Sequence, residues 1–118
     1  MAKILVVDDS PLIHNLMRQA LEKNGHEVCG DAKDGKEALE LYAKLQPDLV
    51  FMDITMPIMD GLEATKAIKS RFPQARVIML SAMGDEELVA EAMNIGVDVF
   101  LKKPFNEYKV VSAISQLM

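Results

Sequence analysis

The chain lacks most of what small extracellular and membrane proteins depend on. Its 118 residues include one cysteine, Cys29, so no disulfide can form within the chain. Its apolar runs are far shorter than a membrane span, and Met1-Ala2-Lys3 leads into a strand-like run without the apolar region of a signal peptide. We therefore expect a protein of the reducing cytoplasm with no membrane segment.

An excess of positive charge is also missing. The formal net charge of −5 argues against electrostatic binding to DNA, RNA or anionic lipid. Half of the residues are hydrophobic, which suffices for the core of one compact domain, and the length leaves no room for a second. We expect a single domain over residues 1–118 with protein or small-anion partners.

What the sequence does contain is an alternation of apolar runs of strand length with segments of helical period. This pattern is typical of βαβ units in a parallel sheet that is covered on both faces. Five helices are predicted to begin after the capping residues Ser10, Asp34, Asp60, Asp85 and Asn106. The fold class is therefore α/β, a doubly wound five-stranded parallel sheet with helices on both faces.

The second strand, near Glu27 to Cys29 and ending at Gly30-Asp31, is the shortest and least apolar of the five. This composition suits an edge strand. Right-handed connections then favour the flavodoxin-like strand order 2-1-3-4-5, which places the first and third strands side by side in the middle.

Polar side chains follow the other four apolar runs at the point where each run ends. Asp8 and Asp9 follow residues 4–7, and Asp53 follows residues 49–52. Ser81 follows residues 77–80, and Lys103 lies just after residues 99–101. Ligands of such sheets bind outside the carboxyl ends of the strands, so these side chains should meet at one edge.

The chemistry follows from crowding three carboxylates together. They would repel one another and raise at least one pKa unless a cation neutralises them, and Mg²⁺ prefers oxygen ligands of this kind. Asp53 can then stay ionised and attack a phosphorus atom to form an acyl phosphate. Lys103, Ser81 and the metal could each hold one phosphoryl oxygen. The sequence therefore predicts a phosphoryl-acceptor site.

Each residue also has a simpler explanation when it is taken alone. The acids before the first helix could merely cap it, Asp53 could be a turn residue, Ser81 a loop hydroxyl and Lys103 a solvated side chain. Their coincidence at one sheet edge favours a functional site. We expect His14 and His26 to be ordinary surface residues.

Together these residues resemble the receiver domain of two-component response regulators, and the resemblance covers the whole chain. It is carried by the following motifs: Asp8-Asp9, Met52-Asp53-Ile54-Thr55-Met56-Pro57, Asp60-Gly61, Ser81-Ala82 and Lys103-Pro104-Phe105.

The resemblance implies a role for each matching residue. Asp53 would be the phosphoacceptor, and Asp8, Asp9 and Asp53 would bind Mg²⁺ together with the backbone carbonyl of Thr55. Ser81 and Lys103 would bind the phosphoryl group. The Lys103-Pro104 peptide bond is usually cis in this family. Phe100 matches an aromatic switch position that acts with Ser81, although an aromatic residue in a strand is most often part of the core.

Because the chain stops after its fifth helix, it looks most like the stand-alone chemotaxis receivers of the CheY type. The resemblance implies a monomeric switch that a histidine kinase phosphorylates and a phosphatase can reset. Its output would be altered binding to a flagellar motor switch protein or another partner through the face of residues 85–117. Thr55 and Met83 replace an asparagine and a glutamate of the enterobacterial protein, at positions that flank the attacking water and affect the lifetime of the phosphorylated state.

Three alternatives stay open. A phosphorelay intermediate would pass the phosphoryl group on to a histidine phosphotransfer domain. A phosphohydrolase of the haloacid dehalogenase type needs an acid two residues after the nucleophile, where Thr55 stands. The switch hypothesis, by contrast, assigns the protein no enzymatic activity beyond self-phosphorylation and self-dephosphorylation. A flavin carrier would be disfavoured by Asp8 and Asp9, which repel an anionic cofactor.

Overall fold

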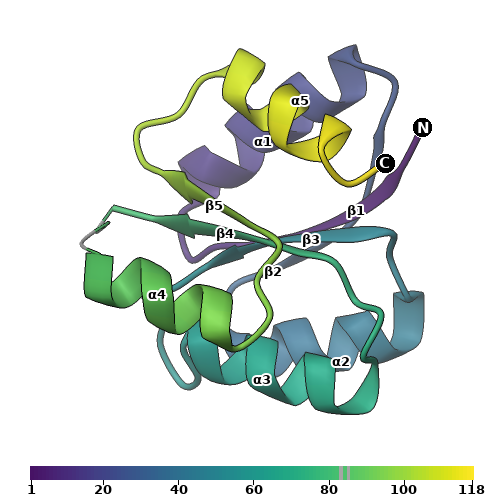
Figure 1. Cartoon of the computed structure of the whole chain (residues 1–118). Helices are drawn as coiled ribbons and strands as arrows, with labels where there is room; N and C mark the ends of the chain where they lie inside the picture. Colours follow the sequence, from purple (N-terminus) through teal and green to yellow (C-terminus); the bar gives the residue numbers. More distant parts are fainter. Residues whose placement is uncertain (83, 85) are drawn as a thin grey trace.

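The computed structural model describes residues 1–82, 84 and 86–118. Within them, five strands alternate with five helices in a single parallel sheet of order β2-β1-β3-β4-β5, which confirms the predicted topology (Figure 1). The elements are β1 (Lys3–Val7), α1 (Pro11–Lys23), β2 (Glu27–Ala32), α2 (Gly35–Leu45), β3 (Leu49–Asp53), α3 (Gly61–Arg71), β4 (Val77–Ser81), α4 (Glu86–Asn94), β5 (Val99–Lys102) and α5 (Glu107–Ser115).

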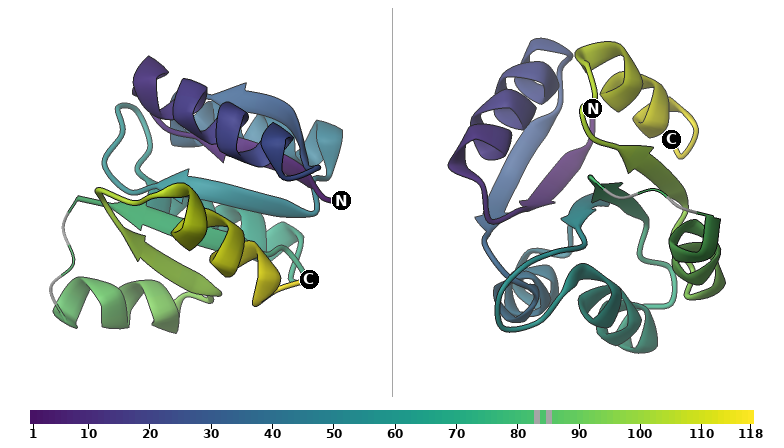
Figure 2. Two further views of the ribbon diagram at one scale, coloured as in Figure 1. Left: turned by 90° about the horizontal axis from the view of Figure 1, so that it is seen from above. Right: turned by 90° about the vertical axis from the view of Figure 1, so that its left-hand side faces the viewer.

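Two layers of helices cover the sheet. Helices α1 and α5 lie on one face, and α2, α3 and α4 lie on the other (Figures 1 and 2). Successive side chains of a strand point to opposite faces, so Ile4 packs under α1 and α5 whereas Leu5 packs under the other three helices. This explains why the central strands are continuous apolar runs rather than alternating ones.

The helix starts follow from side-chain caps. The side chains of Asp34 and Asp60 each accept a hydrogen bond of 2.8 Å from the backbone N–H three residues later. Ser10 and Asn106 do the same for α1 and α5, at 3.4 and 2.9 Å. Each cap contributes about 1 kcal/mol to stability. Four predicted caps are thus confirmed, and the fifth, at Asp85, lies outside the described residues.

Strand β2 is longer than the sequence indicated. Its predicted end at Gly30-Asp31 is wrong, because pairing with β1 continues to the partners Val7 and Ala32 after a register shift. Gly30 belongs to the strand because it pairs with Leu5 of β1. A Cβ atom there would lie 2.9 Å from Cδ1 of Leu45, a residue of α2. The predicted edge position of β2 is confirmed.

No helix in these described ranges is long and apolar enough to cross a membrane.

Thr65 of α3 is fully buried, and its hydroxyl has no hydrogen-bond partner in the part of the chain that the structure describes. An unpaired buried hydroxyl costs stability, so Thr65→Val should raise the free energy of unfolding by about 1 kcal/mol. Thr65→Ser, which keeps the hydroxyl and loses the methyl group, should lower it. Urea denaturation of the two variants measures both changes, and a less stable Thr65→Val protein would contradict the prediction.

Candidate functional site

The carboxyl ends of β1, β3, β4 and β5 lie at one edge of the parallel sheet, as predicted (Figure 2, right). A polar residue ends or follows each of these four strands. Asp8 follows β1, Asp53 and Ser81 are the last residues of β3 and β4, and Lys103 follows β5. Asp8, Asp53 and Ser81 are buried. Buried acids need a partner, and the structure provides one.

Lys103 joins the two buried acids. Its Nζ lies 2.9 Å from Oδ2 of Asp8 and 3.3 Å from Oδ1 of Asp53. Burial alone would lower the pKa of Lys103, but its hydrogen bond to Asp8 and the attraction of both carboxylates raise it above its ordinary value. Lys103 therefore stays cationic and supplies one positive charge to a site with three acids.

One ammonium does not compensate the acids fully. Burial, and next the neighbouring Asp8 carboxylate, raise the pKa of Asp53 from 3.8 to about 6, against the opposing effect of Lys103. A nucleophilic carboxylate must be ionised, and a further cation beside Asp53 would favour its ionised form by lowering its pKa.

The geometry fits a divalent cation with oxygen ligands. One carboxylate oxygen from each of Asp8, Asp9 and Asp53 can be chosen so that all three lie within 4.8 Å of one another. Ligands of octahedral Mg²⁺ at roughly 2.1 Å lie about 3 to 4 Å apart, so small side-chain adjustments would bring these oxygens into position. Asp9 is exposed, which leaves room for the waters that Mg²⁺ usually keeps.

Capping does not explain the two acids after β1. Ser10 is the N-cap of α1. Asp8 accepts the backbone N–H of Ser10 at 2.9 Å through Oδ1 and binds Lys103 through Oδ2. Its carboxylate therefore faces the site and not the first turn of the helix.

The loop after β3 holds Asp53 through a close backbone approach. The N–H of Gly61 donates to the carbonyl of Ile54 at 2.7 Å. A Cβ atom at position 61 would collide with the carbonyl oxygen of Asp53 and lie 2.9 Å from the Cα of Ile54. Only glycine fits where α3 begins, and sequence reasoning had assigned Gly61 to a helix start without this reason.

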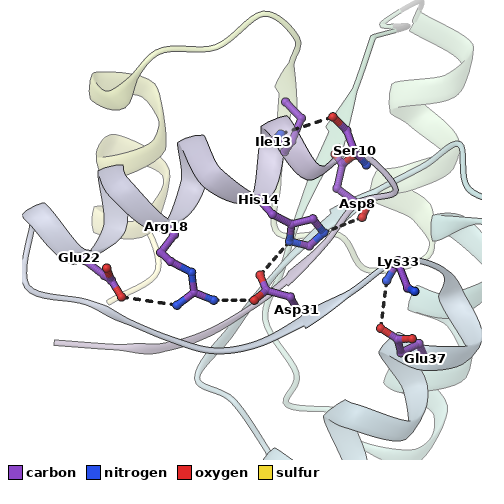
Figure 3. A network of polar contacts seen from close by, with 9 residues as sticks. All are labelled: Asp8, Ser10, Ile13, His14, Arg18, Glu22, Asp31, Lys33 and Glu37. Atoms are coloured by element: carbon purple, nitrogen blue, oxygen red, sulfur yellow. Dashed lines mark hydrogen bonds and ion pairs between the residues drawn. The ribbon is translucent and has the colours of Figure 1, made fainter.

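His14 is the residue that sequence reasoning missed, and its prediction as an ordinary surface residue is wrong. Its Nε2 lies 2.6 Å from the backbone carbonyl oxygen of Asp8, and its Nδ1 lies 2.8 Å from Oδ1 of Asp31 (Figure 3). Its position one turn into the helix after the acids was the available signal. His26 is also partly buried, with Nδ1 accepting the N–H of Ala2 at 3.0 Å.

The remaining candidates lie around this edge. Phe100 is half-buried and packs with Leu88 against the core on the α4 side of the sheet. Thr55 is exposed in the loop after β3. The Lys103-Pro104 peptide bond is cis, as the resemblance implied. Met83, one of the two substituted positions beside the acceptor, lies outside the described residues.

The raised pKa of Asp53 predicts a pH-dependent stability for the metal-free protein. The native state holds the Asp53 proton up to about pH 6 and the unfolded chain releases it near 3.8, so stability falls as the pH rises through this window. Asp53→Asn removes this effect and should raise the free energy of unfolding by about 1 to 3 kcal/mol at pH 7.5 and by little at pH 4. Denaturation at both pH values, with ¹³C NMR titration of the wild-type carboxyl, measures it. Equal effects at the two pH values would contradict it.

Comparison with known proteins agrees with this geometry. Residues 4–115 match the model of the response regulator receiver domain. The chain therefore belongs to the receiver domain family of response regulators. It is 45% identical to the chemotaxis protein CheY of Bacillus subtilis over 116 residues, which cover 98% of this chain and 97% of that protein.

One further sequence relative and one solved structure are also similar to this chain. Protein CcdB of Bacillus subtilis is 44% identical over 118 residues, covering 100% of this chain and 98% of that protein. Among solved structures, a CheX-CheY-BeF3-Mg complex from Borrelia burgdorferi superposes with a TM-score of 0.94 at 35% identity, covering 97% of this chain and 87% of that one. The structural comparison thus shows the receiver fold, and the sequence comparison shows similarity to CheY proteins.

Proposed function

We propose that this protein is a phosphorylation-activated signalling switch of the CheY type, formed by a single receiver domain, in which Asp53 accepts a phosphoryl group from a histidine kinase. The observation that carries the proposal is the ammonium of Lys103 held between Asp8 and Asp53, with the Asp9 carboxylate beside them. Such an arrangement neutralises charge around a nucleophile, which is the main requirement of phosphoryl transfer.

The chain's own residues perform the transfer in one displacement. An ionised oxygen of Asp53 forms a bond to phosphorus while the bond between phosphorus and the phosphodonor's leaving group breaks. The leaving group keeps the electron pair and takes a proton from solvent. Lys103 is placed to donate to a phosphoryl oxygen, and we assign the hydroxyl of Ser81 to a second one.

We assign Mg²⁺ binding to Asp8, Asp9, Asp53 and the backbone carbonyl of Thr55. When bound, Mg²⁺ supplies the positive charge that the three carboxylates lack and holds one phosphoryl oxygen. The same assignment explains why Asp9 is exposed while Asp8 is buried: the metal site opens to solvent on the Asp9 side.

The output follows from the position of Ser81 on β4. A new dianionic group beside Ser81 and Lys103 attracts both, because charge-assisted hydrogen bonds are the strongest contacts there. Movement of Ser81 would make room for Phe100, which pairs with Met79 on the neighbouring strand. The face of α4, β5 and α5, where Met93 and Tyr108 are exposed, would then change its affinity for an output protein such as a flagellar motor switch protein.

The partners and the compartment are part of the same proposal. We infer a cytoplasmic monomer that works with a chemotaxis-type histidine kinase and a phosphatase. A phosphorelay role is the second candidate, because the same acceptor residues would also suit a protein that passes the phosphoryl group on. A phosphohydrolase is less suited, because Thr55 cannot act as the acid that such enzymes place two residues after the nucleophile.

The function is tested by incubating the protein with acetyl phosphate and Mg²⁺. Intact mass spectrometry should show one added phosphoryl group that hydroxylamine removes, since an acyl phosphate is a reactive mixed anhydride. Chelation of Mg²⁺ should lower the rate by at least about 10-fold. A wild-type protein that stays unlabelled would contradict the proposal.

Beryllofluoride with Mg²⁺ then separates the two candidates. For a switch, amide NMR signals should shift across α4, β5 and α5 as well as next to Asp53. Shifts confined to the neighbourhood of Asp53 would favour the phosphorelay role.

A further inference from the structure

His14 connects the backbone beside the acids to the edge of the sheet. Its Nε2 lies 2.6 Å from the carbonyl oxygen of Asp8, and because a carbonyl oxygen can only accept, Nε2 is the donor. On its other side, Nδ1 lies 2.8 Å from Oδ1 of Asp31 in β2. A carboxylate oxygen also only accepts, so both contacts are hydrogen bonds in the imidazolium form of the ring, in which both nitrogens donate. Figure 3 shows the ring between these two groups, with α1 above β2. The ring is mostly shielded, with 15% of the side chain exposed.

The second oxygen of Asp31 is held by the same helix. Arg18 lies four residues after His14, on the same face of α1, and its Nη2 contacts Oδ2 of Asp31 at 2.5 Å. Arg18 also contacts Glu22 at 3.5 Å. The Arg18 and Asp31 side chains are 40% and 39% exposed, and ion pairs of this exposure add little to stability. Their main consequence is geometric: two residues of α1 fix both oxygens of Asp31 and thereby the plane of the His14 ring.

The bond from His14 acts on a particular peptide group. The carbonyl of Asp8 belongs to the planar peptide that joins Asp8 to Asp9, so its direction also sets the direction in which Asp9 leaves the backbone. The other polar groups of Asp8 are fixed as well: its N–H donates to Ala32 at 3.0 Å, and its carboxylate binds the Ser10 N–H and Lys103. The bond from His14 fixes the remaining polar group of Asp8, its carbonyl, which lies in the peptide that joins Asp8 to Asp9.

We propose that His14 is a positioning residue for the metal-binding acids, acting through the Asp8–Asp9 peptide, with Asp31 and Arg18 fixing its ring. This inference rests on the proposed Mg²⁺ site. Groups that orient metal-ligating carboxylates typically change metal affinity by about 10- to 100-fold when they are removed. In this arrangement His14 contacts neither the phosphoryl group nor the side chain of a metal ligand. Its effect should therefore appear in the affinity for Mg²⁺ and in the geometry of the Asp8 carbonyl.

The test is a Mg²⁺ titration of the metal-free protein, followed by calorimetry or amide NMR. His14→Phe keeps a planar ring and loses both nitrogens, and it should raise the dissociation constant for Mg²⁺ by about 10-fold. His14→Gln, whose side-chain amide can still donate to the Asp8 carbonyl, should recover most of the affinity. Without metal, the carbonyl ¹³C signal of Asp8 should move in His14→Phe and return toward the wild-type value in His14→Gln.

His26→Phe is the matched control. His26 also bonds the backbone, through Ala2, but at the opposite end of β1. Both phenylalanine variants should lose thermal stability, and only His14→Phe should lose Mg²⁺ affinity. Wild-type affinity in His14→Phe, or equal losses in the two variants, would overturn the inference. If the wild-type protein bound no Mg²⁺ at all, the proposed function would fail instead, and an unmoved Asp8 carbonyl signal in His14→Phe would separately overturn the positioning role.

Discussion

Asp53→Asn should take up no phosphoryl group from acetyl phosphate in the presence of Mg²⁺, a reduction of at least about 100-fold, because an amide is not a nucleophile toward phosphorus. The loss should not come from unfolding. Asparagine is nearly the same size, its oxygen can still accept from Lys103, and removal of the buried charge should stabilise the metal-free protein at neutral pH. Intact mass spectrometry over time measures the uptake.

Asp60→Asn is the matched control for this variant. Asp60 lies in the same loop and caps α3, and asparagine caps helices as well as aspartate does. Asp60→Asn should therefore be labelled at the wild-type rate. Equal labelling of Asp53→Asn and wild type would show that another residue is the acceptor.

Gly61→Ala should damage the site and the fold together. The added Cβ would collide with the carbonyl oxygen of Asp53 and lie 2.8 Å from its carbonyl carbon, so the backbone of the acceptor must move. Overpacking of this kind typically costs about 1 to 3 kcal/mol, and contact with backbone instead of a flexible side chain places this variant at the upper end. Phosphorylation should slow by at least about 10-fold, because small misplacements of reacting groups are costly. Urea denaturation and the labelling assay measure the two effects.

Gly25→Ala separates local strain from damage to the site. Gly25 has a φ of +83° and no atom within 4 Å of an added Cβ, so alanine there meets no neighbour but adopts an unfavourable backbone conformation. It should cost about 1 to 2 kcal/mol and leave the labelling rate unchanged. If Gly61→Ala behaved like Gly25→Ala in both assays, the close approach to Asp53 would have no functional consequence.

Much of the fold could be predicted because local signals and the pattern of hydrophobic residues agree. The caps at Ser10, Asp34, Asp60 and Asn106 are decided by residues three apart, and the strand order follows from connection rules. The end of β2 was mispredicted because Gly30 reads as a break when the strand is taken alone. Its place in the strand depends on pairing with Leu5 of β1, a residue distant in the sequence that no local pattern contains.

The candidate site likewise contains residues that could be predicted from the sequence and residues that could not. Residues at the ends of strands were predictable, because parallel strands bring their carboxyl ends to one edge and the strand runs are visible in the sequence. His14 was not, because its partner Asp31 comes beside it only through the pairing of β1 with β2. Gly61 was recognised as a helix start, but its contact with Asp53 requires the path of the whole loop.

The uneven burial of the sheet bears on how signals can be transmitted. All five residues of β3 are buried, whereas none of the four residues of β5 is, and α4 has one buried residue, Ala92. Segments with few buried contacts open at lower free energy than the global unfolding of a protein. Asp53 thus lies on a fully buried strand, and the equally buried β4 separates it from the partly exposed β5. A phosphoryl contact needs to outweigh only the local stability of β5 and α4, so the free energy of global folding does not oppose the switch.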